Sequence, residues 1–345
     1  MIDLRSDTVT RPTEAMLESM REATLGDDSR DGDATVRKLE EIAAERMAKE
    51  AAAYMPSGTM TNLVAVMAHV DRGAEVLLEA GSHILNSELG GITAVAGAFY
   101  RAIPGRRGAM DIDALTEGMR SATRQNFGTA LVCMETTHNR AGGAVLPIAH
   151  MRAVHGLAAK REIPVHIDGA RVFNAAAALD VEERAIAQHG DSICFCVSKG
   201  LSAPVGSLLC GSNGYIERAR AYRRMLGGNM RQAGPLAAAG IVALETMVNR
   251  LKEDHATAKQ LAKGLNRIDS GLVDPAEIET NIVKVAVPAD GRRAADWSAH
   301  LKVRGVLVNP CEPYALRFVT HRHIGDAEID EVISAFAALW EINAS

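Results

Sequence analysis

The sequence predicts an α/β fold in which a large domain, built on a mixed or mostly parallel sheet, is followed by a small α+β domain. Three short, nearly continuous apolar runs lie at residues 130–134, 164–167 and 192–197, with helical stretches between them. Such runs are typical of buried parallel strands covered by helices on both faces. A chain of 345 residues is also long enough for one large core and a smaller second one.

Apolar periodicity predicts the elements that precede and join these strands. Residues 35–49 read as an amphipathic helix whose apolar face carries Val36, Leu39, Ile42, Ala43 and Met47. Further helices are expected to open at residues 57–62, continuing to 68, and at 111–115. Additional strands are expected at residues 75–78 and 205–210.

The C-terminal part of the chain has a different pattern. A long helical tract is expected at about residues 232–265, followed by sheet-like segments at 281–287, 306–308 and 316–319. An amphipathic helix over about residues 326–342 ends this region. We therefore expect an N-terminal segment and large domain over residues 1–250 and a small domain over residues 251–345.

Composition excludes several classes of function. The net charge is -5 and there is no basic block, so nucleic acid is not an expected partner. No apolar run approaches the roughly 18 residues of a membrane span, and the charged first residues lack a signal-peptide core. We expect a cytoplasmic protein whose five cysteines are buried and reduced, since Cys194 and Cys196 do not have metal or redox spacing. No cluster of ligands demands a metal ion.

Lys199 and Asp168 are the most informative residues. Each follows an apolar run, and Arg171 lies just after Asp168. The carboxyl ends of parallel strands meet at one edge of a sheet, so these side chains are expected to face one crevice. A lysine that forms a Schiff base and a carboxylate that protonates a pyridine nitrogen are the minimal apparatus of a pyridoxal phosphate enzyme. Singly, each residue also fits a cap or a solvated surface group.

Further candidates stand at other strand ends and at a helix start. Ser57-Gly58-Thr59 opens a helix, where backbone N–H groups favour an anion such as a phosphate, although a plain N-cap explains this motif equally well. His83 and His138 each follow an apolar run. Either could stack on a ring or act as a general base, because imidazole titrates near neutral pH. The alternative for each is a structural histidine.

Several long motifs together resemble the threonine aldolases. They are residues 1–12 (MIDLRSDTVTRP), 57–59 (SGT), 135–139 (ETTHN), 166–174 (HIDGARVFN), 198–201 (SKGL), 203–207 (APVGS), 227–234 (GGNMRQAG) and 316–321 (LRFVTH). The resemblance implies an aspartate-aminotransferase-like fold (fold type I), pyridoxal phosphate, and a homodimer or a homotetramer of dimers with active sites at the subunit interface. It also implies a small-molecule substrate, a β-hydroxy-α-amino acid cleaved to glycine and an aldehyde.

The resemblance also implies roles for individual residues. Those expected at the cofactor are Lys199 as the Schiff-base lysine, Asp168 at the pyridine nitrogen, His83 stacked on the ring, Gly58 and Thr59 at the phosphate, and Arg231 reaching the phosphate from a neighbouring subunit. Those expected at the substrate carboxylate are Ser6, Arg171 and Arg317, because guanidinium forks suit a planar carboxylate. His138 is expected near the β-hydroxyl, with His83 as the other candidate base.

Two positions depart from the family pattern. Residues 27–35 read DDSRDGDAT, which puts Arg30 where the family usually has a tyrosine. Ser87 stands where an aromatic residue is common. One hypothesis is a wider, more polar pocket in which Arg30 meets an anionic side chain, as in 3-hydroxyaspartate. The alternative is that Arg30 faces solvent or pairs with Asp31 or Asp33.

Other functions remain open from the sequence. The nearest rivals keep the cofactor and change the reaction to β-elimination, dehydration or racemisation of a related polar amino acid. A rival of a different class is a catalytically silent binding protein on the same scaffold.

Overall fold

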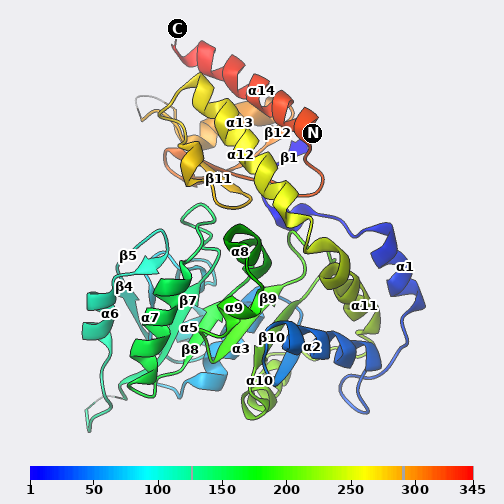
Figure 1. Cartoon of the computed structure of the whole chain (residues 1–345), viewed down its shortest axis with the longest axis vertical. Coiled ribbons are helices and arrows are strands. Elements are labelled where there is room, and N and C mark those ends of the chain that lie inside the picture. The colour runs from blue at the N-terminus through cyan, green and yellow to red at the C-terminus, as the bar shows by residue number, and fades with distance from the viewer. Residues whose placement is uncertain (126, 290–291, 345) are drawn as a thin grey trace.

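A seven-stranded sheet forms the centre of the larger part of the molecule in the computed structural model, which describes residues 1–125, 127–289 and 292–344 (Figure 1). The strand order is β2-β10-β9-β8-β7-β3-β4, and β10 alone runs antiparallel to its neighbours. The bounds are β2 Ala51–Met55, β3 Glu75–Glu79, β4 Phe99–Ile103, β7 Thr129–Glu135, β8 Val165–Asp168, β9 Ser192–Cys196 and β10 Ser207–Gly211.

The three apolar runs that predicted parallel strands form adjacent parallel strands. Val132 of β7 pairs with Val165 of β8, and Ile167 of β8 pairs with Ile193 of β9. All residues of β8 and β9 are buried. The strand expected at 205–210 is β10, and its antiparallel direction makes the sheet mixed.

Helices cover both faces of this sheet. Leu208 and Cys210 of β10 belong to a core shared with Leu39 and Ala43 of helix α2 (Ala34–Arg46). The alternate residue, Leu209, belongs to a separate core that includes residues of α3 (Gly58–His69) and α10 (Asn213–Met225). This alternation follows from the two-residue period of a strand. It confirms the predicted layered α/β architecture.

The remaining elements of the larger part are mostly short. Their bounds are η1 Asp7–Val9, α1 Glu14–Glu22, α4 His83–Asn86, α5 Gly91–Ala94, β5 Gly105–Arg106, β6 Ala109–Met110, α6 Ile112–Gly118, α7 Ile148–Ala159, α8 Val172–Leu179 and α9 Arg184–Ala187.

The helical tract predicted at residues 232–265 is broken into parts. Helix α11 (Gly234–Val242) passes into a π-helical turn, η2 (Ala243–Met247), and α12 (Leu251–Ile268) follows after a short break. The apolar residues on either side of the break serve different cores. Leu244 packs with the large sheet, whereas Leu261 packs in the C-terminal core. The predicted helical tract is therefore confirmed, with a break that divides it between the two cores.

The C-terminal part has its own core beside a three-stranded antiparallel sheet (Figure 1). Its further elements are η3 Pro275–Glu277, β11 Ile282–Ala286, α13 Ala294–Val303, β12 Val306–Leu307, β13 Asn309–Glu312, β14 Ala315–Val319 and α14 Asp326–Ala344. Strand β1 (Ile2–Asp3) pairs with β12, and Leu4 joins this core. The N-terminal segment is therefore attached to the C-terminal part, while the domain division at residue 250 stays a prediction.

The cysteines are all free, and four of them are buried as expected. Cys311 is exposed because it lies on β13, an edge strand whose other residues are largely exposed, so the expectation of a buried thiol was wrong there. Among the described residues, every helix is too short or too polar to cross a bilayer. The cytoplasmic location stays a prediction.

Candidate active site

The candidate residues gather because they follow the carboxyl ends of strands that run in one direction. Ser57 follows β2, His83 follows β3, Asp168 ends β8 and Lys199 follows β9. Ligands bind at this edge in open α/β sheets. A cavity of about 390 Å³ opens there. It is lined by Thr8, Pro56, Ser57, Gly58, Thr59, Asn62, His83, Glu88, Asp168, Ala170, Cys196, Ser198, Lys199, Pro204 and Val205.

Asp168 is a buried and ionised carboxylate beside Lys199. Its Oδ2 accepts a hydrogen bond from Asn62 Nδ2 (2.9 Å), and its Oδ1 accepts one from the backbone N–H of Ala170 (3.1 Å). Burial raises the pKa of Asp168, but the positive charges of His83 and Lys199 outweigh it and hold the pKa below its usual value. The ionised carboxylate of Asp168 would stabilise the protonated nitrogen of a pyridine ring bound in this cavity.

Asn62 and Glu88 are parts of the site that sequence reasoning missed. Asn62 Nδ2 also donates to Glu88 Oε1 (2.8 Å), and its Oδ1 lies 3.2 Å from His166 Nε2. The available signal was an amide in a helix whose neighbouring residues are mostly apolar, since a buried amide needs partners. Asn62 thus fixes the direction of two carboxylates at once.

The start of α3 forms a cradle for an anion. Ser57 Oγ accepts from the backbone N–H of Met60 (3.2 Å), so Ser57 is an N-cap as well as a lining residue. The backbone N–H groups at Gly58 and Thr59 belong to the first turn, which has no intrahelical acceptors for them. A Cβ added at Gly58 would lie 2.9 Å from Cys196 Sγ. Glycine is therefore needed for the helix start to approach the cavity so closely.

His83 is the histidine that lines the cavity. Its Nδ1 lies 2.9 Å from Glu88 Oε1, and its backbone N–H donates to Glu135 Oε2 (2.6 Å). The hydrogen bond to Glu88 raises the pKa of His83, against the opposing effect of burial. Ligand atoms of His83, Glu88 and Asp168 lie within 4.8 Å of one another, and the hydrogen bonds through Asn62 account for that cluster.

His138 lies outside the group of residues that line the cavity. Its Nε2 is 3.0 Å from Glu79 Oε2, and its Nδ1 accepts the backbone N–H of Ala141 (3.2 Å). Burial lowers the pKa of His138, but the hydrogen bond to Glu79 more than offsets this and raises it. Both ring nitrogens of His138 are therefore hydrogen-bonded to protein atoms.

The two arginines expected at the substrate carboxylate differ in charge balance. Arg171 donates from Nε and Nη2 to the two carboxylate oxygens of Asp7, each at 2.7 Å, and both side chains are buried. Burial raises the pKa of Asp7, but Arg171 outweighs it and holds that pKa far below its usual value. Asp7 thus neutralises Arg171, a pairing that the sequence did not reveal.

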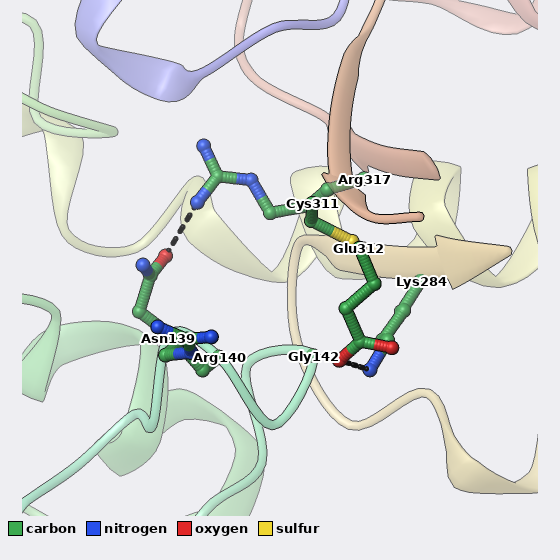
Figure 2. A pocket seen from close by; sticks show the side chains of 7 residues that line it. All are labelled: Asn139, Arg140, Gly142, Lys284, Cys311, Glu312 and Arg317. Carbon is green, nitrogen blue, oxygen red and sulfur yellow. Dashed lines mark hydrogen bonds and ion pairs between the residues drawn. The ribbon is translucent and has the colours of Figure 1, made fainter. Parts of the chain in front are cut away.

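Arg317 is held by neutral groups only, as far as the described residues show. Nη1 donates to Asn139 Oδ1 at 2.8 Å (Figure 2). Nη2 donates to the backbone oxygen of Arg5 (3.2 Å). Its Nε is buried without a hydrogen-bond partner. Burial lowers the pKa of Arg317, and the charge of Arg171 lowers it further. Ser6 Oγ, the third expected group, accepts the N–H of Thr8 (3.2 Å).

Ser6, Arg171 and Arg317 lie outside the group of residues that line the cavity, and so do the remaining expected residues. Arg231 is 64% exposed and its Nη1 is 3.6 Å from Asp27 Oδ1. Arg30 is 78% exposed and its Nε is 3.8 Å from Asp27 Oδ2, so its ion pair is with Asp27 and neither Asp31 nor Asp33. Ser87 is exposed at the end of α4.

Comparison with known proteins identifies the family. The sequence model of the family described as beta-eliminating lyase matches residues 3–288. The chain belongs to the beta-eliminating lyase family. This lyase is 43% identical over 344 residues to the probable low-specificity L-threonine aldolase 2 of Arabidopsis thaliana, covering 98% of this chain and 97% of the relative.

Other relatives of this lyase agree. It is 40% identical over 341 residues to the low specificity L-threonine aldolase of Escherichia coli (strain K12), with 99% and 98% of the chains covered. The solved structure of Leishmania major threonine aldolase superposes with a TM-score of 0.84 at 16% identity, covering 98% and 99%. The resemblance and the aspartate-aminotransferase-like fold, fold type I, are confirmed.

The residues at the cavity fit pyridoxal phosphate, the cofactor implied by this family and fold. The ionised Asp168 meets the requirement of the ring nitrogen, the helix start at Gly58 meets that of a phosphate, and Lys199 provides the amine.

Proposed function

We propose that the protein is a pyridoxal-phosphate-dependent aldehyde-lyase that cleaves β-hydroxy-α-amino acids such as L-threonine to glycine and an aldehyde. The observation that carries this proposal is the placement of Lys199 and Asp168 in one cavity, together with a partly buried Arg317 whose charge no described carboxylate balances. The names of the two similar aldolases support the same reaction.

Residues of the cavity would hold the cofactor as follows. Lys199 would attach to its aldehyde carbon, Asp168 would keep the ring nitrogen protonated, and the first turn of α3 would bind the phosphate. His83 would lie against the ring. When bound, the cofactor withdraws electrons from the bond that breaks next to the substrate amine.

The chain's own groups select the bond and move the proton. Arg317 binds the substrate carboxylate and so fixes the orientation of the bonds at Cα. His83, which lines the cavity, accepts the proton of the β-hydroxyl as the Cα–Cβ bond breaks. His138 instead has a structural role, since both of its ring nitrogens are hydrogen-bonded to protein atoms.

Product analysis tests the proposed reaction. The holoenzyme is incubated with L-threonine and L-allo-threonine, and the products are separated. Aldol cleavage gives glycine and acetaldehyde in equal amounts, whereas elimination gives ammonia and a keto acid, and racemisation gives the D-amino acid. Ammonia and keto acid without glycine would overturn the proposal in favour of the eliminating alternative.

We also propose a homodimer, or a homotetramer of dimers, in which Arg231 of a second copy reaches the phosphate. Among the described lining residues, Lys199 is the sole lysine or arginine, and it would be attached to the cofactor's aldehyde carbon. A phosphate carries nearly two negative charges at neutral pH. The exposed Arg231 would supply the missing cation.

Mixing two inactive variants tests this shared site. Lys199→Ala and Arg231→Ala are purified separately and allowed to exchange subunits. If Arg231 acts across the interface, each mixed dimer contains one intact site, and activity returns to about a quarter of the wild-type value. No recovery despite exchange, which mass-tagged subunits would monitor, would place Arg231 in its own chain's site. An active Arg231→Ala would place it outside any site.

Arg30 is proposed as a determinant of the substrate's distal end in the same assembly. Its side chain shares Asp27 with Arg231, so both would approach a neighbouring site together. Turnover of threonine, phenylserine and 3-hydroxyaspartate is compared in wild type and Arg30→Ala. A selective loss for 3-hydroxyaspartate is expected, and equal relative rates would remove Arg30 from the pocket.

A further inference from the structure

We propose that Asn139 is a positioning residue for the substrate carboxylate, because it holds Arg317 in place with a neutral acceptor. The inference rests on the proposed function, in which Arg317 binds that carboxylate. Asn139 would not touch the reacting atoms. It would act through the guanidinium alone.

The contact joins two separate parts of the fold. Arg317 lies on β14 of the C-terminal sheet, and Asn139 lies on the loop after β7 of the large sheet. Figure 2 shows the guanidinium directed at Asn139 Oδ1, and the distance from Nη1 is 2.8 Å. A cavity of about 40 Å³ lies beside the pair. This is enough space for a small polar group.

Asn139 is itself fixed by a buried carboxylate. Its backbone N–H donates to Glu135 Oε1 (2.8 Å), and the other oxygen of Glu135 accepts the N–H of His83 (2.6 Å). Glu135 is only 5% exposed. One rigid group therefore sets the positions of both the cavity histidine and the partner of Arg317. Glu135 therefore fixes the distance between His83, which would lie against the cofactor ring, and Asn139, which holds the arginine for the substrate carboxylate.

The neutral charge of Asn139 is the essential property. Arg171 shows what a carboxylate does nearby, because Asp7 accepts hydrogen bonds from both Nε and Nη2 of its guanidinium. The carboxylate of Glu312, which also lines the small cavity, is committed to Lys284 Nζ at 2.5 Å. Arg317 thus keeps its positive charge for a ligand. An aspartate at position 139 would compete with the substrate for the same fork.

The test compares Asn139→Asp, Asn139→Ala and the control Arg140→Gln as holoenzymes. Arg140→Gln lowers the net charge by one, as Asn139→Asp does, at an exposed neighbour that lines the same small cavity. Binding of glycine and of methylamine, which is glycine without its carboxylate, is followed by the absorbance of the bound cofactor. Threonine cleavage gives KM and kcat.

For Asn139→Asp we expect glycine binding and the KM for threonine to weaken by about ten- to a hundredfold, with kcat changed by less than about threefold. Methylamine binding should stay unchanged, as should both ligands in Arg140→Gln. Asn139→Ala should lie in between. Wild-type preference for glycine over methylamine in Asn139→Asp, or an equal loss for both ligands, would overturn the inference. A wild type that prefers glycine but does not cleave threonine would instead refute the proposed function.

Discussion

At the scale of single residues, the site is controlled by which charges are balanced inside the protein and which are left for a ligand. Asp168 is ionised and Arg171 is neutralised by Asp7. Arg317 and Lys199 have no described carboxylate within ion-pair distance and remain available. A carboxylate of a ligand would balance the charge of Arg317, and Lys199 would be free to bond the aldehyde carbon of a cofactor.

The His83–Glu88 contact predicts the pH dependence of the base. Glu88 raises the pKa of His83, so the neutral form that accepts a proton becomes dominant only at a higher pH. Glu88→Gln removes the negative charge and should lower that pKa. We expect the acidic limb of kcat/KM to move to lower pH. The exposed variant Glu277→Gln is the control, and an unchanged limb would contradict the role of His83.

At the scale of elements, the start of α3 depends on close contact with the end of β9. Gly58→Ala places a methyl group 2.9 Å from Cys196 Sγ, a short side chain that has little room to move. We expect a loss of about 1–3 kcal/mol in the free energy of unfolding and weaker binding of pyridoxal phosphate. Urea denaturation and fluorescence titration of the apoprotein measure these effects.

A second substitution distinguishes crowding from other causes. Cys196→Ala removes the sulfur that the new methyl group would meet, so the double variant should recover part of the lost stability. Additive losses in the two variants would show that the contact is not the reason for the glycine.

The elements that sequence predicts well are those whose apolar pattern is uninterrupted. Strands β7, β8 and β9 are largely buried on both faces, so most of their residues are apolar. Strand β2 was missed because its Ala51-Ala52-Ala53 run has low β propensity and is placed by packing between α2 and α3. Strand β4 was missed because Phe99 and Tyr100 are exposed at the edge of the sheet.

The same reasoning separates predictable from unpredictable site residues. Lys199 and Asp168 stand next to strand ends, which local sequence reveals. Asn62, Glu135 and Asp7 each act through at least one partner 52 or more positions away in the chain, which the apolar pattern of the strands does not reveal. Their roles arise only when the sheet brings separate strand ends together.

At the scale of the whole molecule, Asp7 ties three regions together. It belongs to the N-terminal segment. Its carboxylate accepts hydrogen bonds from Nε and Nη2 of Arg171 beside the large sheet, and from Nδ2 of Asn281 (3.2 Å) next to β11. Asp7→Asn should leave Arg171 charged and unpaired in a buried place. We expect a loss of about 3–5 kcal/mol in stability, measured by urea denaturation at neutral pH.

The pH dependence of stability gives a second check on Asp7. Its pKa is depressed in the folded protein, so its contribution is fully present above the ordinary aspartate pKa of about 3.9 and is lost as the pH falls toward the folded value. Asp7→Asn should therefore lose the most stability relative to wild type at neutral pH, and the difference should shrink in acid. A difference that is independent of pH would contradict the ion pair.

Strand β1 also bears on how the chain is synthesised. Ile2 and Asp3 pair with Val306 and Leu307, so β1 pairs with a strand that the ribosome makes after the whole of the large sheet. Strand β1 must therefore stay unpaired until β12 has been made. The hydrogen bond from Thr10 Oγ1 to the backbone oxygen of Lys199 (2.8 Å) belongs to the same N-terminal segment and depends on its final position. Contacts of such long sequence separation form late. The surroundings of Lys199 are therefore complete only after β12 has been synthesised.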